Sequence, residues 1–139
     1  MHPSTIEFSL SQFILFVTGT WIGFFIMAVS ATVCFYNRKS PVNRYFSIYA
    51  LLVSIWALIG SFNLSFMIWP AHSVLLQMVL SSFLGTVFLF FGKAAVNENY
   101  RPAGYDLLWL VPPVSFLVIS VAILSVPELF AAFSDSLII

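Results

Sequence analysis

Four long stretches of apolar residues, separated by short polar segments, organise the chain. They cover residues 13–35, 45–68, 74–91 and 107–126, and none contains an acidic or basic residue. A helix needs about 20 apolar residues to cross the roughly 30 Å hydrocarbon layer of a membrane, and none of the stretches alternates apolar with polar residues as barrel strands do. Because backbone groups in lipid must be bonded within their own segment, the pattern predicts an all-α fold, an integral membrane four-helix bundle that forms one domain over residues 1–139.

The basic residues all fall in the first and third connections between these stretches. They are Arg38, Lys39 and Arg44 in the first connection, and Lys93 and Arg101 in the third. Loops rich in Lys and Arg remain in the cytoplasm, so both connections are expected on that side. Both ends of the chain, the dozen or so N-terminal residues and residues 127–139, are therefore predicted to lie on the outer side.

Composition indicates lipid rather than water as the main solvent. Hydrophobic residues make up 61% of the chain and charged residues only 7%, whereas about 25% of the residues in soluble domains are charged. Five basic and five acidic residues give a net charge of zero, so no overall field attracts nucleic acid. The expected partners are membrane lipids and other membrane proteins, and nucleic acid is not expected.

Small residues mark one side of the first span. Gly19 and Gly23 form a GxxxG pattern, and Ala28 and Thr32 continue the stripe. Small residues at this spacing let a second helix approach closely. The approaching helix belongs either to this chain or to another protein, and the spacing alone leaves both open.

Polar and small residues also share one side of the third span. Gln77, Ser81 and Gly85 are four residues apart, which places them on one side of a helix. That side is expected to face protein rather than lipid, with Asn63 of the second span as a hydrogen-bond partner of Gln77. The residues serve either as packing contacts or as part of a substrate pathway.

Two consecutive prolines lie near the start of the fourth span. Pro112 and Pro113 lack backbone N–H groups, so they bend or loosen the beginning of the helix. Since proline is favoured in the first turn of a helix, regular helix is predicted to begin near Leu110.

Residues with chemical reactivity are scarce in the predicted spans. No ionisable residue lies in the middle of a span, and the chain contains no HExxH, GxSxG or P-loop motif. We therefore expect no enzymatic activity and no metal site. His72, at the outer boundary, is the one candidate for binding a cofactor such as a pigment, through its imidazole. The alternative is an ordinary solvated loop residue.

Several short passages resemble the N-terminal seven-helix sensor region of bacterial histidine kinases. They are residues 37–46 leading to Trp56, residues 88–91, and the passage from Tyr100 and Arg101 to Pro112 and Pro113. The resemblance covers the first four helices and implies a signal-transducing membrane module. Residues 127–139 leave no room for three more spans. Two interpretations follow. The chain is either a four-helix relative of this sensor region with another role, or a fragment of a longer protein in which residues 136–139 begin a fifth helix.

Three functions fit this pattern. The leading hypothesis is a non-catalytic accessory subunit that packs against helices, lipids or cofactors of a larger complex in the bacterial inner membrane, such as an energy-converting or photosynthetic one. Lipid, pigment or quinone at the partner interfaces would be the bound groups. The alternatives are a sensor module related to histidine kinases and a small transporter or channel protomer.

Overall fold

The structure, a computed structural model, describes residues 10–68 and 70–137, and its regular elements there are all helical. The elements are α1 (Leu10–Tyr36), α2 (Pro41–Phe66), α3 (Ala71–Val96), the 3₁₀ helix η1 (Gly104–Leu110), α4 (Val111–Ser125) and α5 (Pro127–Ser136). Four helical segments, α1, α2, α3 and η1 with α4, are long and apolar enough to cross a membrane. The predicted all-α, multi-pass membrane architecture is confirmed.

The ends of the helices differ from the ends of the apolar stretches. α2 begins at Pro41 rather than at residue 45, because proline suits the first helical position, where no N–H partner is needed. It ends at Phe66, since Met67 adopts a left-handed backbone with φ 53°. α3 continues through Lys93 to Val96, because helical hydrogen bonding can persist after the apolar run has ended.

The fourth span begins as a 3₁₀ helix. η1 carries the chain from Gly104 to Leu110, and α4 starts at Val111 with Pro112 and Pro113 in its first turn. The first turn of a helix tolerates missing N–H groups, so the two prolines fix the place where regular α-helix begins. The predicted start near Leu110 is confirmed.

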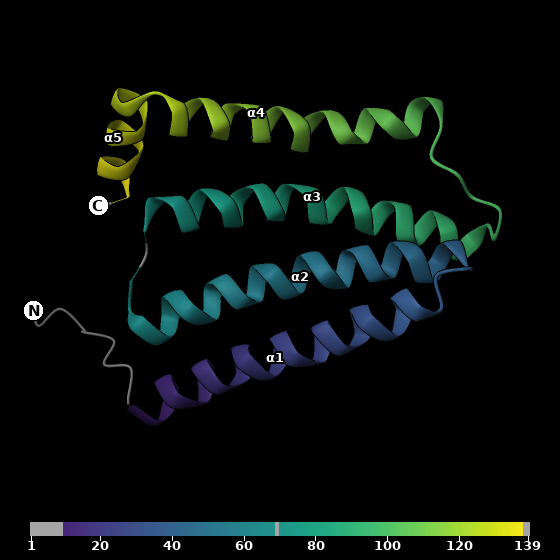
Figure 1. The fold of residues 1–139 in the computed structure, drawn as a ribbon, viewed down its shortest axis with the longest axis horizontal. Helices are drawn as coiled ribbons and strands as arrows, with labels where there is room; N and C mark the ends of the chain where they lie inside the picture. Colours follow the sequence, from purple (N-terminus) through teal and green to yellow (C-terminus); the bar gives the residue numbers. More distant parts are fainter. Residues whose placement is uncertain (1–9, 69, 138–139) are drawn as a thin grey trace, which may run out of the picture.

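The four long helices lie side by side in chain order, each antiparallel to the one before (Figure 1). Their packing runs from α1 to α2, from α2 to α3 and from α3 to α4, and α1 and α4 form the two edges of the row. The most buried apolar side chains of the described residues belong mainly to α3. Large apolar side chains of all four long helices remain exposed, so the row presents an apolar surface to its surroundings.

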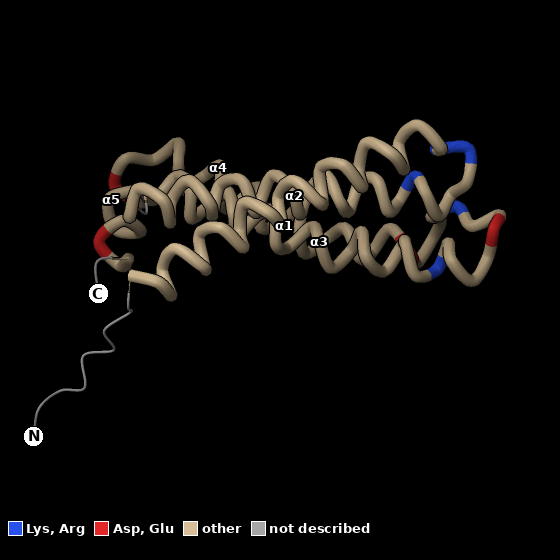
Figure 2. Tube along the Cα trace, turned by 90° about the horizontal axis from the view of Figure 1, so that it is seen from below, with Lys and Arg blue, Asp and Glu red and all other residues tan. Residues whose placement is uncertain are grey.

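Charged residues separate toward the two ends of the row (Figure 2). We call the end that carries the basic residues the basic end. It contains Arg38, Lys39, Arg44, Lys93 and Arg101. Glu128 and Asp135 lie at the opposite end, where α5 turns across the end of α4. Residues 1–9, 69 and 138–139, and with them part of the predicted outer segments, fall outside the described residues.

Candidate functional site

The small-residue side of α1 is open. A Cβ atom added at Gly19 or at Gly23 would meet no atom of the described chain within 4 Å. Thr32 is exposed, and its hydroxyl donates a hydrogen bond to the carbonyl oxygen of Ala28 in its own helix, at 2.9 Å. α1 instead buries Ala31. Among the residues that the structure describes, no helix uses the close approach that the two glycines permit.

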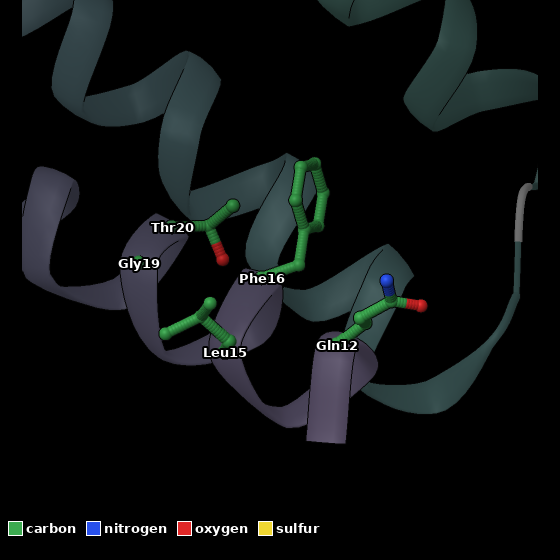
Figure 3. Close-up of a pocket in the computed structure, with 5 residues that line it drawn as sticks. All are labelled: Gln12, Leu15, Phe16, Gly19 and Thr20. Carbon is green, nitrogen blue, oxygen red and sulfur yellow. The ribbon is translucent and has the colours of Figure 1, made fainter. Parts of the chain in front are cut away.

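A shallow hollow of about 480 Å³ lies over the N-terminal half of α1. Figure 3 shows the lining residues along α1, with Gly19 and Thr20 at one end of the group, Gln12 at the other, and the side chains of Leu15 and Phe16 pointing apart between them. The lining is mainly apolar, with Thr20 and Gln12 as its polar members. Such a surface suits a lipid chain or another apolar helix.

α1 and α2 separate toward the end opposite the basic end, which leaves an apolar groove of about 400 Å³ between them (Figure 1). Gly23 of α1 and Gly60 of α2 contribute to its walls, together with Trp56 and Gln77. Below the groove the indole Nε1 of Trp21 donates a hydrogen bond to the Ser65 hydroxyl at 3.2 Å. This hydrogen bond joins α1 to α2 near the open apolar space.

Gln77 contacts α2 through a backbone carbonyl rather than through Asn63. Its Nε2 lies 3.4 Å from the carbonyl oxygen of Trp56 and would lie 3.1 Å from a Cβ at Gly60. Trp56 and Gly60 are one helical turn apart, so the missing side chain at Gly60 uncovers that carbonyl. Asn63 is buried, and its Nδ2 has no hydrogen-bond partner among the described residues. The predicted bond between Asn63 and Gln77 is wrong.

The other members of the predicted α3 stripe are exposed. Ser81 donates a hydrogen bond to the carbonyl oxygen of Gln77 in its own helix, at 2.8 Å, and Gly85 has open space where a Cβ would be. α3 turns a different side toward its neighbours, with Leu75, Val79 and Val87 buried. Over residues 10–68 and 70–137, Gln77 is the one member of the stripe that contacts a neighbouring helix.

A buried stripe of small residues on α2, which was not predicted from the sequence, packs within the chain. We call it the α2 stripe, and its members are Ser47, Ala50, Ser54, Ala57 and Ser61. Ala50 and Ser61 are fully inaccessible to solvent, and Ser54 is nearly so. The Ser47 hydroxyl donates to the carbonyl oxygen of Ala31 on α1 at 3.0 Å. Spacings of three and four residues repeat every seven, which is the pattern of a helix seam and the signal that was available in the sequence.

An aromatic cluster joins three segments at the basic end. The ring centroids of Tyr45, Phe90 and Tyr100 lie 6.0 to 6.4 Å from one another. Beside them, Lys93 forms an ion pair with Asp106, which ties α3 to η1. Burial of the hydroxyl, followed in importance by the nearby Asp106 carboxylate, raises the pKa of Tyr100 to about 12, so Tyr100 stays neutral at physiological pH.

His72 lies at the start of α3, at the end opposite the basic end. Its exposed ring lies 4.6 Å, centroid to centroid, from the ring of Phe130 on α5. The described residues contain no group of three His, Cys, Asp or Glu side chains that could hold a metal ion. His72 as a cofactor ligand stays a prediction, and the structure shows its ring in contact with Phe130 of α5.

Comparisons with protein-family models, with curated proteins and with solved structures gave no match. The resemblance to kinase sensor regions stays a prediction.

Proposed function

We propose that this protein is a non-catalytic subunit of the bacterial inner membrane that packs the open side of α1 against a helix of another membrane protein. The observation that carries the proposal is the open space at Gly19 and Gly23, a close-approach motif that no helix of the described chain occupies. The basic end faces the cytoplasm in this proposal, following the distribution of Lys and Arg.

The position of α1 in the row supports this role. α1 is an edge helix, and none of its most apolar 18-residue window is buried inside the chain. In lipid, helices associate through close packing rather than through the hydrophobic effect, so an edge helix with small residues is well suited to hold a partner. Exposed Phe16, which lines the same hollow as Gly19, adds a large apolar contact beside the glycines.

The test is recovery of the partner from native membranes. The tagged protein is extracted in a mild detergent, and its companions are quantified by mass spectrometry. We expect one membrane protein to co-purify in a fixed ratio, and we expect a Gly19→Ile/Gly23→Ile variant to lose it by about tenfold or more, because bulky residues prevent close approach.

Gly92 supplies the matched control. It is an exposed helical glycine with open space around it, but it lies on α3. Gly92→Ile should retain the partner. Equal loss in both variants, or recovery of the wild type as a lone monomer, contradicts the proposal. If the partner is a second copy of this chain, and only Gly19→Ile/Gly23→Ile disrupts the dimer, the open side of α1 is still a packing surface. The role as an accessory subunit of another complex is then overturned.

A further inference from the structure

A polar hollow of about 760 Å³ opens at the basic end, between the α1–α2 connection and the α3–η1 connection. Three cationic side chains line it: Lys39, Arg44 and Arg101. Lys39 precedes α2, Arg44 lies in its first turn, and Arg101 comes from the other connection. Segments about 60 residues apart in sequence thus bring three positive charges to one concave surface.

The remaining lining residues moderate this charge without cancelling it. One carboxylate, that of Glu98, belongs to the lining, together with Asn99 and the rings of Tyr45 and Tyr100. Three cations and one anion leave an excess of two positive charges. Concave surfaces concentrate the field of such charges on a ligand of opposite sign.

The three cations are unpaired within the described part of the chain. Lys39, Arg44 and Arg101 are exposed, and the described residues contain no ion pair that includes them. The other two basic residues are already engaged. Lys93 pairs with Asp106, and the guanidinium of Arg38 lies over the ring of Phe35, 4.6 Å from its centroid. The hollow therefore gathers those basic side chains that have no partner.

The depth of the hollow identifies the kind of anion. It lies where α2 begins and α3 ends, which is the level at which a spanning helix leaves the hydrocarbon layer and meets lipid phosphates. The first turn of α2 contains no acidic residue, so the positive end of its helix dipole adds to the side-chain charges. Tyr45 and Tyr100 provide the amphipathic rings that favour this boundary.

We propose that this hollow, lined by Lys39, Arg44 and Arg101, binds the phosphate of an anionic phospholipid headgroup. The two arginines present planar N–H donors to the phosphate oxygens, and Lys39 adds a point charge. Basic hollows of this kind on the cytoplasmic side of membrane proteins suit lipids that carry a net negative charge. A zwitterionic lipid carries an ammonium group that the same cations repel.

The experiment is a lipid titration of the full chain in detergent, followed by native mass spectrometry. Dioleoylphosphatidylglycerol is the anionic probe, and dioleoylphosphatidylcholine is the neutral one. We expect the anionic lipid to bind at least tenfold more tightly. Each cation removed should weaken its binding about fivefold, so Arg44→Gln/Arg101→Gln should lose roughly 25-fold.

Arg38→Gln is the matched control, because Arg38 lies in the same connection as Lys39 but outside the hollow. It should change lipid binding less than twofold, whereas Arg44→Gln alone should weaken it about fivefold. Arg44→Lys keeps the charge, so it should bind the anionic lipid with most of the wild-type affinity. That result would show that Arg44→Gln weakens binding by removing a charge from the site and not by disturbing the fold. Circular dichroism verifies that each variant remains helical.

Three outcomes overturn the assignment. Equal binding of the two lipids removes the preference for negative charge. Equal weakening of lipid binding by Arg38→Gln and Arg44→Gln would mean that binding depends on the net charge of the protein and not on this hollow. Displacement of the anionic lipid by inorganic phosphate at the same concentration assigns the hollow to a free phosphate anion rather than to a lipid. None of these results bears on the α1 face, so the accessory-subunit proposal is tested separately.

Discussion

The two small-residue stripes of the molecule have opposite surroundings. The α2 stripe is packed within the chain, with Ala50 and Ser61 inaccessible and Ser47 bonded to α1. The stripe on α1 meets nothing within 4 Å at Gly19 and Gly23. GxxxG spacing indicates that a helix can be approached closely, but the position of the helix in the row decides whether a neighbour from the same chain does so. α2 has neighbours on both sides, whereas α1 lies at an edge.

The largest expected effect comes from enlarging the middle of the α2 stripe. Ala50→Leu inserts a branched side chain where no solvent-accessible space exists, so it should lower the free energy of unfolding by about 1–3 kcal/mol. Helicity followed by circular dichroism during an SDS titration of detergent-solubilised protein measures the change. Ala95→Leu, at an exposed position near the end of α3, should have little effect. A similar loss in the two variants would contradict the packing assigned to the α2 stripe.

Much of the architecture could be predicted because it depends on local properties of the chain. Apolar length predicts the four spans, proline chemistry predicts the start of regular helix near Leu110, and basic residues in two connections predict one charged end. These features do not require knowledge of how the helices are rotated about their axes. That rotation decides which stripe meets a neighbour, and hydrophobicity on every side of a helix leaves it undetermined.

The contact made by Gln77 illustrates what the sequence leaves undetermined. Asn63 and Gln77 lie toward the same end of adjacent helices, so spacing alone made a bond between them reasonable. The amide instead lies over Gly60, where the absence of a side chain exposes the carbonyl of Trp56. A glycine can therefore uncover a backbone carbonyl one turn away as a hydrogen-bond acceptor for the neighbouring helix, and a search for polar side-chain partners does not detect such a site.

A second comparison sets Gly19 against Gly60. Gly19→Ala gains helix propensity without any clash and should stabilise the isolated protein by roughly 0.5–1 kcal/mol. Gly60→Ala gains the same propensity but places its Cβ 3.1 Å from Nε2 of Gln77. The added methyl group must displace the Gln77 amide from the Trp56 carbonyl oxygen. The net gain in the free energy of unfolding should therefore be smaller than for Gly19→Ala, or negative. The same SDS titration measures both variants, and a larger stabilisation by Gly60→Ala would contradict the observed placement of Gln77.

The smallest predicted change in stability concerns two serine hydrogen bonds, one between helices and one within a helix. The Ser47 hydroxyl donates to the carbonyl oxygen of Ala31 on the neighbouring helix at 3.0 Å, whereas the Ser30 hydroxyl donates to Ile26 in its own helix at 2.8 Å. Interhelical bonds of this kind in membranes contribute about 0.6 kcal/mol on average. Ser47→Ala should therefore destabilise the protein by about that amount, while Ser30→Ala, which removes only a local bond, should change stability less.

Separating such small effects requires a double-variant cycle, in which Ser47→Ala is combined with Ala50→Leu. If Ala50→Leu already pushes α1 away from α2, the bond from Ser47 to Ala31 is lost with it, and Ser47→Ala should add almost nothing in that background. Additive effects would mean that α1 stays in place and that the cost of Ala50→Leu arises elsewhere, most directly at the contact of α2 with α3. The cycle thus tests whether Ser47 and Ala50 belong to one contact with α1. Such a contact within the chain distinguishes the buried α2 stripe from the open stripe on α1.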